Sequence, residues 1–214
     1  VESGHRKRGA IVKTRVCVVS QRTFSGDPRL TTEVRSLLDA GYEVDIVCMR
    51  GKGQSFRGTE IGAQLYRIPS IERKRVGKLR YVIEYASFFI PALILLAVLQ
   101  IKRGYRMVHV TNLPDLLVFS AVVPKLLGAK IIFDVRECTP EMFIDRFGAK
   151  PESRVVRLMT KLEQASIRFA DATITCTEQM RQALIKRGGQ RDKISVIMNM
   201  PAAHLEREAV LPDP

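Results

Sequence analysis

The sequence predicts an α/β fold in which a mostly parallel sheet of about seven strands is covered by helices on both faces. Short apolar runs alternate with longer helical patterns along the chain, which is typical of βαβ units. The runs are nearly continuous in apolar residues, as in strands buried on both faces. The length of 214 residues fits one sizeable core, and a composition of 46% hydrophobic and 27% charged residues is ordinary for a globular protein.

The first predicted unit is a strand followed by a helix. The run RVCVVS, from Arg15 to Ser20, predicts a buried strand. A helix is predicted from Pro28 to Ala40, because Asp27 is a good N-cap and proline is favoured at the first helical position. Gly41 follows directly and suits a helix end.

The same alternation continues along the chain. Further strands are predicted at Glu43 to Met49, Ala63 to Pro69, Met107 to Thr111, Lys130 to Val135, Ala172 to Cys176 and Lys193 to Met198. Helices are predicted at Tyr85 to Ile101, Asp115 to Leu127, Ser153 to Phe169 and Glu178 to Arg187. This succession indicates a Rossmann-like, doubly wound domain. We expect a basic N-terminal tail over residues 1–14, the domain over 15–201 and a linker or tail over 202–214.

The charge of the chain is strongly positive, with a formal net charge of +13, and much of it is clustered. Basic residues gather between His5 and Arg15 and in the stretch ERKRVGKLR, from Glu72 to Arg80. Such clusters attract nucleic acid, anionic lipid or phosphorylated substrates. They contain no aromatic stacking surface, and the chain has no helix-turn-helix or zinc signature, so we expect no nucleic-acid partner.

The four cysteines are far apart, with no C-x-x-C pair and no histidines at zinc-ligand spacing. Neither a disulfide framework nor a structural metal is therefore indicated, and a reducing cytosol fits best. The chain also lacks G-x-G-x-x-G after the first strand and lacks the P-loop motif, which disfavours a dehydrogenase and P-loop chemistry.

The predicted helix from Tyr85 to Ile101 contains 17 residues without a charge. It is shorter than the ~20 residues that a membrane span needs, and Pro91 interrupts it. Because basic stretches flank it on both sides, it fits a helix lying in the interface of an anionic membrane. It fits equally a core helix packed on the sheet.

Ligands of open α/β sheets bind beyond the carboxyl ends of the strands, so the polar loops there are the candidate sites. After the first strand, Gly26 and Arg29 could help the start of the next helix to bind an anion, although Asp27 can equally serve only as a cap. After the strand ending at Thr111, Asn112 could orient a ligand, and Asp115 suits a helix cap. His109 lies inside that strand, where a structural role is favoured.

The stretch KIIFDVRECTPEMF, from Lys130 to Phe143, places an arginine among acids where a buried strand ends. Arg136 offers donors suited to a phosphate, a carboxylate or a sugar, and Glu137 and Glu141 could orient it or accept sugar hydroxyls. The alternative is an internal ion pair of Arg136 with Asp134 or Glu141. No histidine is near Cys138 in sequence to make it a nucleophile.

Four segments in order resemble the N-terminal domain of a family-four, GT-B-type glycosyltransferase over nearly the whole chain. They begin with DPRLTTEVRSLLDAGYEVDIVC and HVTNLPDLLVFSAVVPKLLGAKIIFDVRECTPEMF and end with FADATITCTEQMRQALIKRG and DKISVIMNMP. The resemblance implies two Rossmann-like domains facing a cleft, with the acceptor held by the N-terminal one and the nucleotide-sugar by the C-terminal one. It implies a retaining mechanism without an essential metal or other cofactor, in which electrostatics stabilise the leaving diphosphate.

This resemblance places the site residues in two groups. Arg136 and Glu137 are the expected catalytic residues. The residues expected to bind acceptor or phosphate are Gly26, Asp27, Arg29, Asn112, Asp115 and Glu141. Where many relatives have histidines, this chain has Arg136 and Thr111, which argues against a histidine-based role there.

The donor-binding Glu-x7-Glu pair of the family is absent from the chain. We therefore expect the acceptor-binding half of a hexosyltransferase, inactive alone, whose nucleotide-sugar is bound by a C-terminal domain. A lipid-linked or polysaccharide acceptor is expected, with the protein in the cytoplasm or peripheral at the inner face of the membrane. The alternative is a non-catalytic module that recognises a glycan or glycolipid. The sugar, the nucleotide and the pathway are left open.

Overall fold

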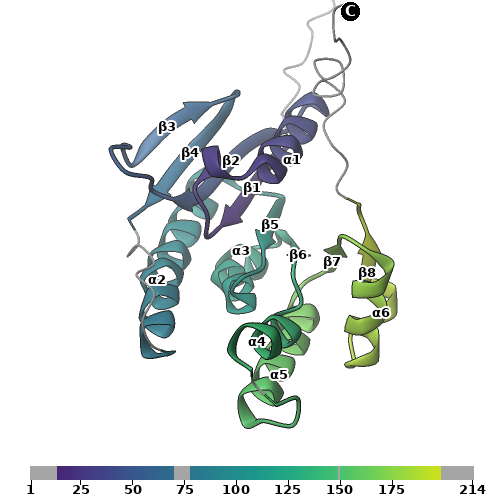
Figure 1. Cartoon of the computed structure of the whole chain (residues 1–214). Coiled ribbons are helices and arrows are strands. Elements are labelled where there is room, and N and C mark those ends of the chain that lie inside the picture. Colours follow the sequence, from purple (N-terminus) through teal and green to yellow (C-terminus); the bar gives the residue numbers. More distant parts are fainter. Residues whose placement is uncertain (1–13, 70–77, 149, 199–214) are drawn as a thin grey trace, which may run out of the picture.

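The computed structural model describes residues 14–69, 78–148 and 150–198 and confirms the α/β architecture (Figure 1). The described residues form one eight-stranded sheet in the order β3-β4-β2-β1-β5-β6-β7-β8. All neighbouring strands are parallel except β3, which pairs antiparallel with β4. The predicted N-terminal and C-terminal tails lie outside the described residues, apart from Thr14.

The strands lie close to the predicted apolar runs. They are β1 (Arg15–Ser20), β2 (Glu43–Met49), β3 (Arg57–Glu60), β4 (Ala63–Ile68), β5 (Met107–Thr111), β6 (Lys130–Val135), β7 (Ala172–Thr175) and β8 (Ile194–Val196). The bounds of β1, β2, β5 and β6 are those predicted. Strand β3 was not predicted, because its sequence RGTE has no apolar residue. Its strand conformation depends on antiparallel pairing with β4.

The helices differ more from the prediction. They are α1 (Pro28–Asp39), α2 (Lys78–Arg103), α3 (Val122–Leu126), α4 (Thr139–Phe147), α5 (Arg154–Phe169) and α6 (Glu178–Lys186), with short 3₁₀ helices η1 (Phe24–Gly26), η2 (Asp115–Ala121) and η3 (Arg191–Lys193). Helix α2 is longer than expected, and most of the helix expected after β5 is the 3₁₀ segment η2. Helix α4 was not predicted, since the sequence after β6 was interpreted as a loop.

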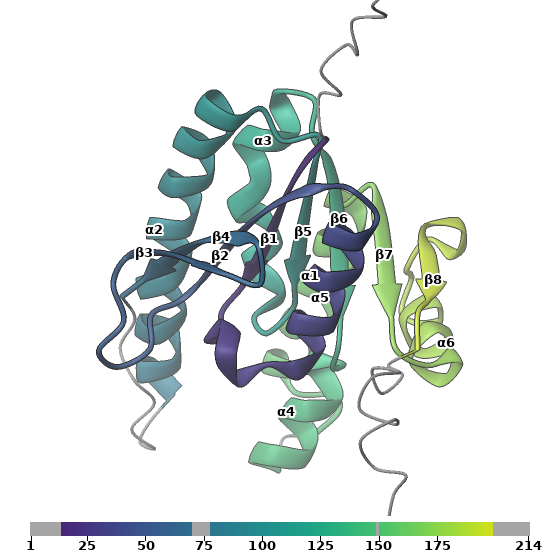
Figure 2. The same ribbon diagram turned by 90° about the horizontal axis from the view of Figure 1, so that it is seen from above.

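The sheet is covered unequally on its two faces (Figure 2). One face carries the larger core, to which α2, η2, α5 and α6 contribute Phe88, Leu117, Ile167 and Leu184. The other face carries a smaller core under α1, built on β1, β2 and β4. Doubly wound folds normally cover both faces, so the part of the second face beyond α1 is a place to look for a ligand or a partner.

Helix α2 shows that the core interpretation of the long apolar helix is correct for one of its faces. Phe88, Ala92 and Leu96 are fully buried against the sheet and η2. They recur every four residues, which places them on one side of the helix. The helix is also long and apolar enough to cross a membrane by length and composition, although a third of its most apolar window is buried inside the protein.

Strands β1, β5 and β6 lie side by side at the centre of the sheet, which brings the loops after them together. Thr111 at the end of β5 donates a hydrogen bond to the hydroxyl of Ser20 at the end of β1 (3.1 Å). The backbone N–H of Asn112 donates to the carbonyl of Asp134 in β6 (2.8 Å). The polar loops identified in the sequence therefore form one continuous edge.

Candidate functional site

The start of α1 is fixed by Asp27, which has two partners. Its Oδ1 accepts a hydrogen bond from the backbone N–H of Leu30 (3.1 Å) and so caps the helix. Its Oδ2 accepts from Nη1 of Arg136 (2.9 Å), although the two residues are 109 positions apart. Asp27 is only 4% exposed, so both oxygens are committed to holding α1 against the end of β6.

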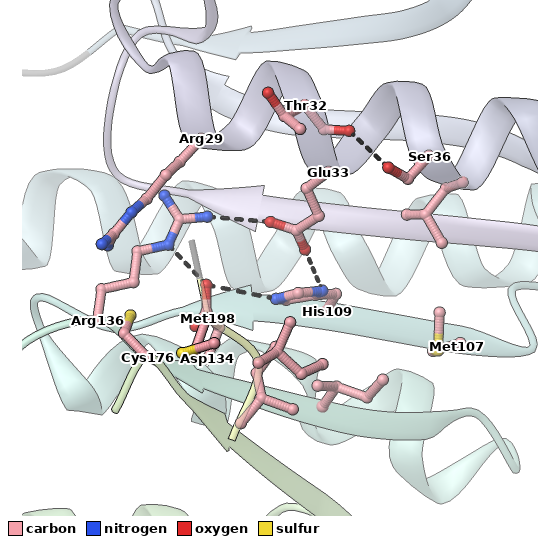
Figure 3. A pocket seen from close by; sticks show the side chains of 14 residues that line it. Arg29, Thr32, Glu33, Ser36, Met107, His109, Asp134, Arg136, Cys176 and Met198 are labelled. Atoms are coloured by element: carbon pink, nitrogen blue, oxygen red, sulfur yellow. Dashed lines mark hydrogen bonds and ion pairs between the residues drawn. The ribbon is translucent and has the colours of Figure 1, made fainter. Parts of the chain in front are cut away.

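Arg136 is surrounded by three carboxylates, of which Glu33 and Asp134 are shown in Figure 3. Besides Asp27, its guanidinium donates to Oε2 of Glu33 (3.0 Å) and Oδ2 of Asp134 (2.6 Å). The side chain is 9% exposed. All three bonds are charge-assisted, which makes them stronger than neutral ones. The internal ion pair with Asp134, considered from the sequence, is therefore present and extends to two acids of the first helical unit.

His109 joins the same network from the middle of β5. Its Nδ1 lies 2.5 Å from Oε1 of Glu33 and its Nε2 lies 3.7 Å from Oδ2 of Asp134. Burial lowers the pKa of His109, but the charge of Glu33 and the bonds with both acids outweigh it and raise the pKa to about 9. The imidazole is therefore a cation at neutral pH.

The network has one surplus negative charge at neutral pH. Three carboxylates, Asp27, Glu33 and Asp134, face two cations, Arg136 and His109. Burial raises the pKa of Asp134, but the bonds and charges of His109 and Arg136 outweigh it and hold the pKa below its usual range. Such a network attracts no anion, and it fixes α1, β5 and β6 relative to one another.

Glu33, His109 and Asp134 also form a group whose ligand atoms lie within 4.8 Å of one another, as in a metal site. A metal would need a neutral imidazole and carboxylates free to coordinate it. Here the imidazole is protonated and both carboxylates accept bonds from Arg136. The chemistry of this group therefore fits an ion-pair network better than a metal centre.

A groove of ≈ 460 Å³ runs between α1 and strands β6 to β8, on the face that α1 covers only in part (Figure 3). Its floor is apolar and is formed mainly by Ile132, Ile174, Ile197 and Met198. Its wall is the polar side of α1, with Arg29, Thr32 and Ser36. We call this space the α1 groove.

Arg29 is the cation of the α1 groove that has room for a ligand. It is exposed, and among the described residues it has neither a hydrogen bond nor an ion pair. It lies on α1 one turn before Glu33, and Figure 3 shows it beside Arg136, but it is not part of the network. An anionic group entering the groove from the carboxyl edge would therefore meet Arg29 and not the enclosed Arg136.

A second, wide-open groove of ≈ 710 Å³ lies on the other side of Arg136, between α4 and α6. Glu137, Glu141 and Asp145 line it on one side, and Gln179 and Met180 line it on the other. We call it the α4–α6 groove. Glu137 is exposed there, and its backbone carbonyl accepts a bond from Asn112 (2.6 Å), which fixes the loop without using the carboxylate.

Asn112 and Asp115 are buried and mainly hold the loops together. Asn112 accepts a bond from the backbone N–H of Arg136 (2.9 Å) and donates to Asp115 (3.2 Å). Burial raises the pKa of Asp115 to about 7, despite bonds from Thr139 and Asn112. Neither residue lines one of the two grooves.

Glu141 belongs to a second ion network. Arg187 contacts Glu141 and makes two bonds of 2.7 Å with Glu163, which is 1% exposed. Burial raises the pKa of Glu163 in spite of Arg187. This network joins α4, α5 and the end of α6, so it holds the wall of the α4–α6 groove.

The structure thus separates the predicted site residues by their surroundings. Gly26 lies in the exposed turn η1 before α1. Arg29 lines the α1 groove and Glu137 and Glu141 line the α4–α6 groove, whereas Arg136 borders both grooves with a side chain that is only 9% exposed. The sequence analysis missed Glu33. Its position on the same helical face as Arg29 and Ser36 was the available signal, but the partner strands were not known.

Comparisons with known proteins agree with this architecture. The family model described as "Glycosyl transferase 4-like domain" matches residues 27–200. A search of curated proteins found no matching sequence.

Among solved structures, sucrose-phosphate synthase from Thermosynechococcus elongatus matches with a TM-score of 0.62 and 14% identity, over 94% of this chain and 53% of that one. UGT89C1 of Arabidopsis thaliana, determined with UDP, matches with a TM-score of 0.58 and 11% identity, over 92% of this chain and 55% of that one. HepE of Anabaena, determined with UDP-glucose, matches with a TM-score of 0.52 and 15% identity, over 89% of this chain and 45% of that one. The chain spans about half the length of these three proteins.

Proposed function

Because this chain belongs to the glycosyl transferase 4-like domain family and has the fold of the N-terminal domain of a GT-B-type glycosyltransferase, we propose that it is the acceptor-binding half of such an enzyme. The enzyme would move a hexose from a nucleotide-sugar to a lipid-linked or polysaccharide acceptor, with retention of configuration. The nucleotide-sugar would be bound by a C-terminal domain that is not part of the 214 residues. We place the reaction in the cytoplasm.

The observation that carries the proposal is the arrangement of the carboxyl edge of the sheet. Two grooves open there on either side of Arg136, and each contains a charged side chain that the ion networks leave available. Arg29 in the α1 groove suits a phosphate of a lipid-linked acceptor, because guanidinium groups bind phosphate oxygens through paired donors. Glu137 in the α4–α6 groove suits sugar hydroxyls, which donate to carboxylates.

We assign different roles to the two residues expected to be catalytic. Arg136 acts as a positioning residue, since its guanidinium already donates to three carboxylates. It fixes the loop on which Glu137 stands. Glu137 can contact the acceptor directly, as a hydrogen-bond acceptor for the attacking hydroxyl.

The proposal needs no metal ion. Among the described residues, the two carboxylates of the group with metal-ligand geometry, Glu33 and Asp134, already pair with Arg136 and with the third member, His109. Stabilisation of the departing diphosphate would come from positive groups of the donor-binding domain and from the positive ends of helices, as electrostatic catalysis allows.

Binding measurements on the 214-residue chain test the proposal. We expect a polyprenyl-diphosphate-linked sugar in detergent micelles or a polysaccharide fragment to bind, and UDP-glucose not to bind. Arg29→Ala should weaken binding of the diphosphate-linked acceptor about tenfold, and Glu137→Gln should do so for both acceptor types, because each removes one charge-assisted bond. Exposed Arg57, on the edge strand β3, provides the matched control Arg57→Ala.

Two results would contradict the proposal. Tight binding of UDP-glucose to this chain would place the donor site here. Release of UDP in a coupled transfer assay with the chain alone would show that it is catalytically complete. Acceptor binding without transfer, even when the full-length protein is supplied with nucleotide-sugars, would instead identify a non-catalytic recognition module.

A further inference from the structure

The outer face of α2 is apolar although it is turned away from the core. Its exposed side chains are Ile83 (49%), Ile90 (54%), Ile94 (60%), Val98 (42%) and Ile101 (77%). The spacings of seven, four, four and three residues place them on one side of the helix. From Ile83 to Ile101 the stripe is about 27 Å long at the helical rise of 1.5 Å per residue. We call it the α2 stripe.

A helix that faces water normally carries polar residues on its outer side. The described part of α2 contains one acid, Glu84, and that residue is buried (7% exposed). Ile101 and Ile94 are more than half exposed, so the stripe is not shielded by neighbouring elements. Contiguous apolar surface of this kind marks a place where a protein contacts another molecule or a membrane.

The α2 stripe cannot enter a bilayer as a span. The opposite side of the helix, with Phe88, Ala92 and Leu96, is fully buried and forms part of the main core. Pulling the helix out would expose the apolar core beneath it to water, which opposes insertion. Any membrane contact must therefore be made by the outer face of a helix that stays packed on the sheet.

Charges at both ends of the stripe indicate the occupant. Lys102 and Arg106 are exposed at the C-terminal end, and the sequence that precedes the stripe, ERKRVGKLR from Glu72 to Arg80, is rich in basic residues. The stripe between them has no charge. Anionic headgroups complement such ends, and apolar side chains between basic flanks suit the boundary between headgroups and acyl chains. A second copy of the chain would bring like charges together at both ends in either orientation, which opposes self-association.

We propose that the α2 stripe lies on the surface of an anionic lipid bilayer, with its five apolar side chains at the headgroup boundary and its basic ends on lipid phosphates. Leu126 and Leu127 at the end of α3 are 80% and 58% exposed, and α3 packs beside α2. They extend the apolar surface at the end of the helix that carries Ile101. This surface lies outside both grooves and does not depend on the reaction that the protein performs.

The direction of α2 determines which edge of the sheet a bilayer along the α2 stripe would approach. The helix follows β4 and precedes β5, so its N-terminal end lies toward the carboxyl edge of the sheet, where both grooves open. A bilayer along the α2 stripe would therefore come near that edge. If the proposed function holds, a lipid-linked acceptor would not need to leave the membrane surface to reach it.

The chain has no tryptophan, which permits a direct test. Ile94→Trp places a single fluorophore on the α2 stripe, and Leu158→Trp places one at an equally exposed position of α5 (60% and 59%). Vesicles of phosphatidylcholine with phosphatidylglycerol should shift the emission of Ile94→Trp to the blue, and brominated lipid should quench it. Leu158→Trp should show neither effect, and vesicles of phosphatidylcholine alone should give a weaker shift.

Vesicle flotation of the whole chain provides a second measurement. Ile94→Glu should lower the partition coefficient about tenfold or more, because it replaces an apolar contact with the bilayer by a negative charge facing anionic lipid. Leu158→Glu should leave it unchanged. Ile94→Ser, which adds no charge, should give a smaller loss in the same direction, and circular dichroism should show that all variants keep the wild-type fold.

Three outcomes would overturn the proposal. The first is that the unmodified chain does not float with anionic vesicles, and the second is that Ile94→Glu floats as well as Leu158→Glu. The third is that light scattering shows a dimer that Ile94→Glu dissociates, which would make a second copy the occupant. None of these results requires glycosyl transfer, so they are independent of the test of the proposed function.

Discussion

Replacing Arg136 by methionine tests the ion network that holds the carboxyl edge. Methionine has a similar length and no charge, so the change removes the donors and keeps most of the volume. Asp27, Glu33 and Asp134 would lose a common partner. Asp27 would keep its bond from Leu30, and the other two acids would keep His109.

The expected cost follows from the burial of the groups left behind. Arg136, Asp27 and Asp134 have side chains 9%, 4% and 9% exposed, so solvent screens them little. Removing one partner of a buried ion pair costs about 3–5 kcal/mol. Since two of the three carboxylates retain a cation, we expect a value near the lower end. In a domain of this size, that range lowers Tm by roughly 6–20 °C.

Urea denaturation followed by circular dichroism measures this cost. The deficit of Arg136→Met should be largest at pH 7.5 and smaller at pH 5. Arg136 helps to hold the pKa of Asp134 down against burial, so without the guanidinium the folded-state pKa of Asp134 rises, and its carboxylate then contributes less stability as the pH rises. The matched control is Lys130→Met at the start of the same strand, where Lys130 is 76% exposed and lies 3.8 Å from Asp171. It should change stability by less than about 0.5 kcal/mol.

Two results would refute this reasoning. A loss below about 1 kcal/mol at pH 7.5 would show that the three carboxylates do not depend on Arg136. A deficit that grows toward pH 5 would show that the groups uncovered by the substitution are not acids. Either result would also remove the basis for treating Arg136 as a positioning residue.

Three further predictions concern the neighbouring titratable groups. Because the pKa of His109 is raised to about 9, its stabilising charge is fully present below about pH 6.5 and lost as the pH rises through about 9. The stability of the wild type relative to His109→Gln should therefore fall by roughly 3 kcal/mol across this window, and an unchanged difference in urea titrations would contradict it. Because burial raises the pKa of Asp115 to about 7, the carboxylate destabilises the fold as the pH rises toward 7. Asp115→Asn should raise Tm at pH 8 and leave it nearly unchanged at pH 4, and a lower Tm at pH 8 would show that the negative charge is required. Arg187→Met should cost about 3–5 kcal/mol, since Glu163 is 1% exposed, whereas Arg187→Met with Glu163→Gln should cost less; equal losses in urea denaturation would contradict the pairing.

The sequence was sufficient to predict the central strands and the family. β1, β2, β5 and β6 have the predicted bounds because continuous apolar runs are a strong signal for a doubly buried strand. β3 carries no such signal and depends on its partner β4. The residues from Asp115 to Ala121 are a 3₁₀ helix because they pack between α2 and α5, a tertiary constraint that local periodicity does not contain.

The sequence predicted which loops form the site but not which of their side chains contact one another. The sequence indicated that the loops after β1, β5 and β6 would carry the polar residues, and the parallel order of these strands brings the loops together. It could not indicate that Arg136 meets Asp27 and Glu33, which are 109 and 103 residues away. Long-range ion pairs of this kind depend on the order of the strands in the sheet, which a pattern of apolar residues does not specify.

The enclosure of Arg136 by three carboxylates gives an arginine among acids a structural role at this edge. An exposed guanidinium would bind whatever anion approached, whereas one held by three carboxylates fixes α1 and the loop after β6. The two grooves then differ in the sign of their available charge, positive at Arg29 in one and negative at Glu137 and Asp145 in the other. A phosphate and a sugar hydroxyl would therefore be drawn to opposite sides of the same rigid element. Under the proposed function, that separation would orient the hydroxyl of a lipid-linked acceptor relative to its phosphate before any donor is present.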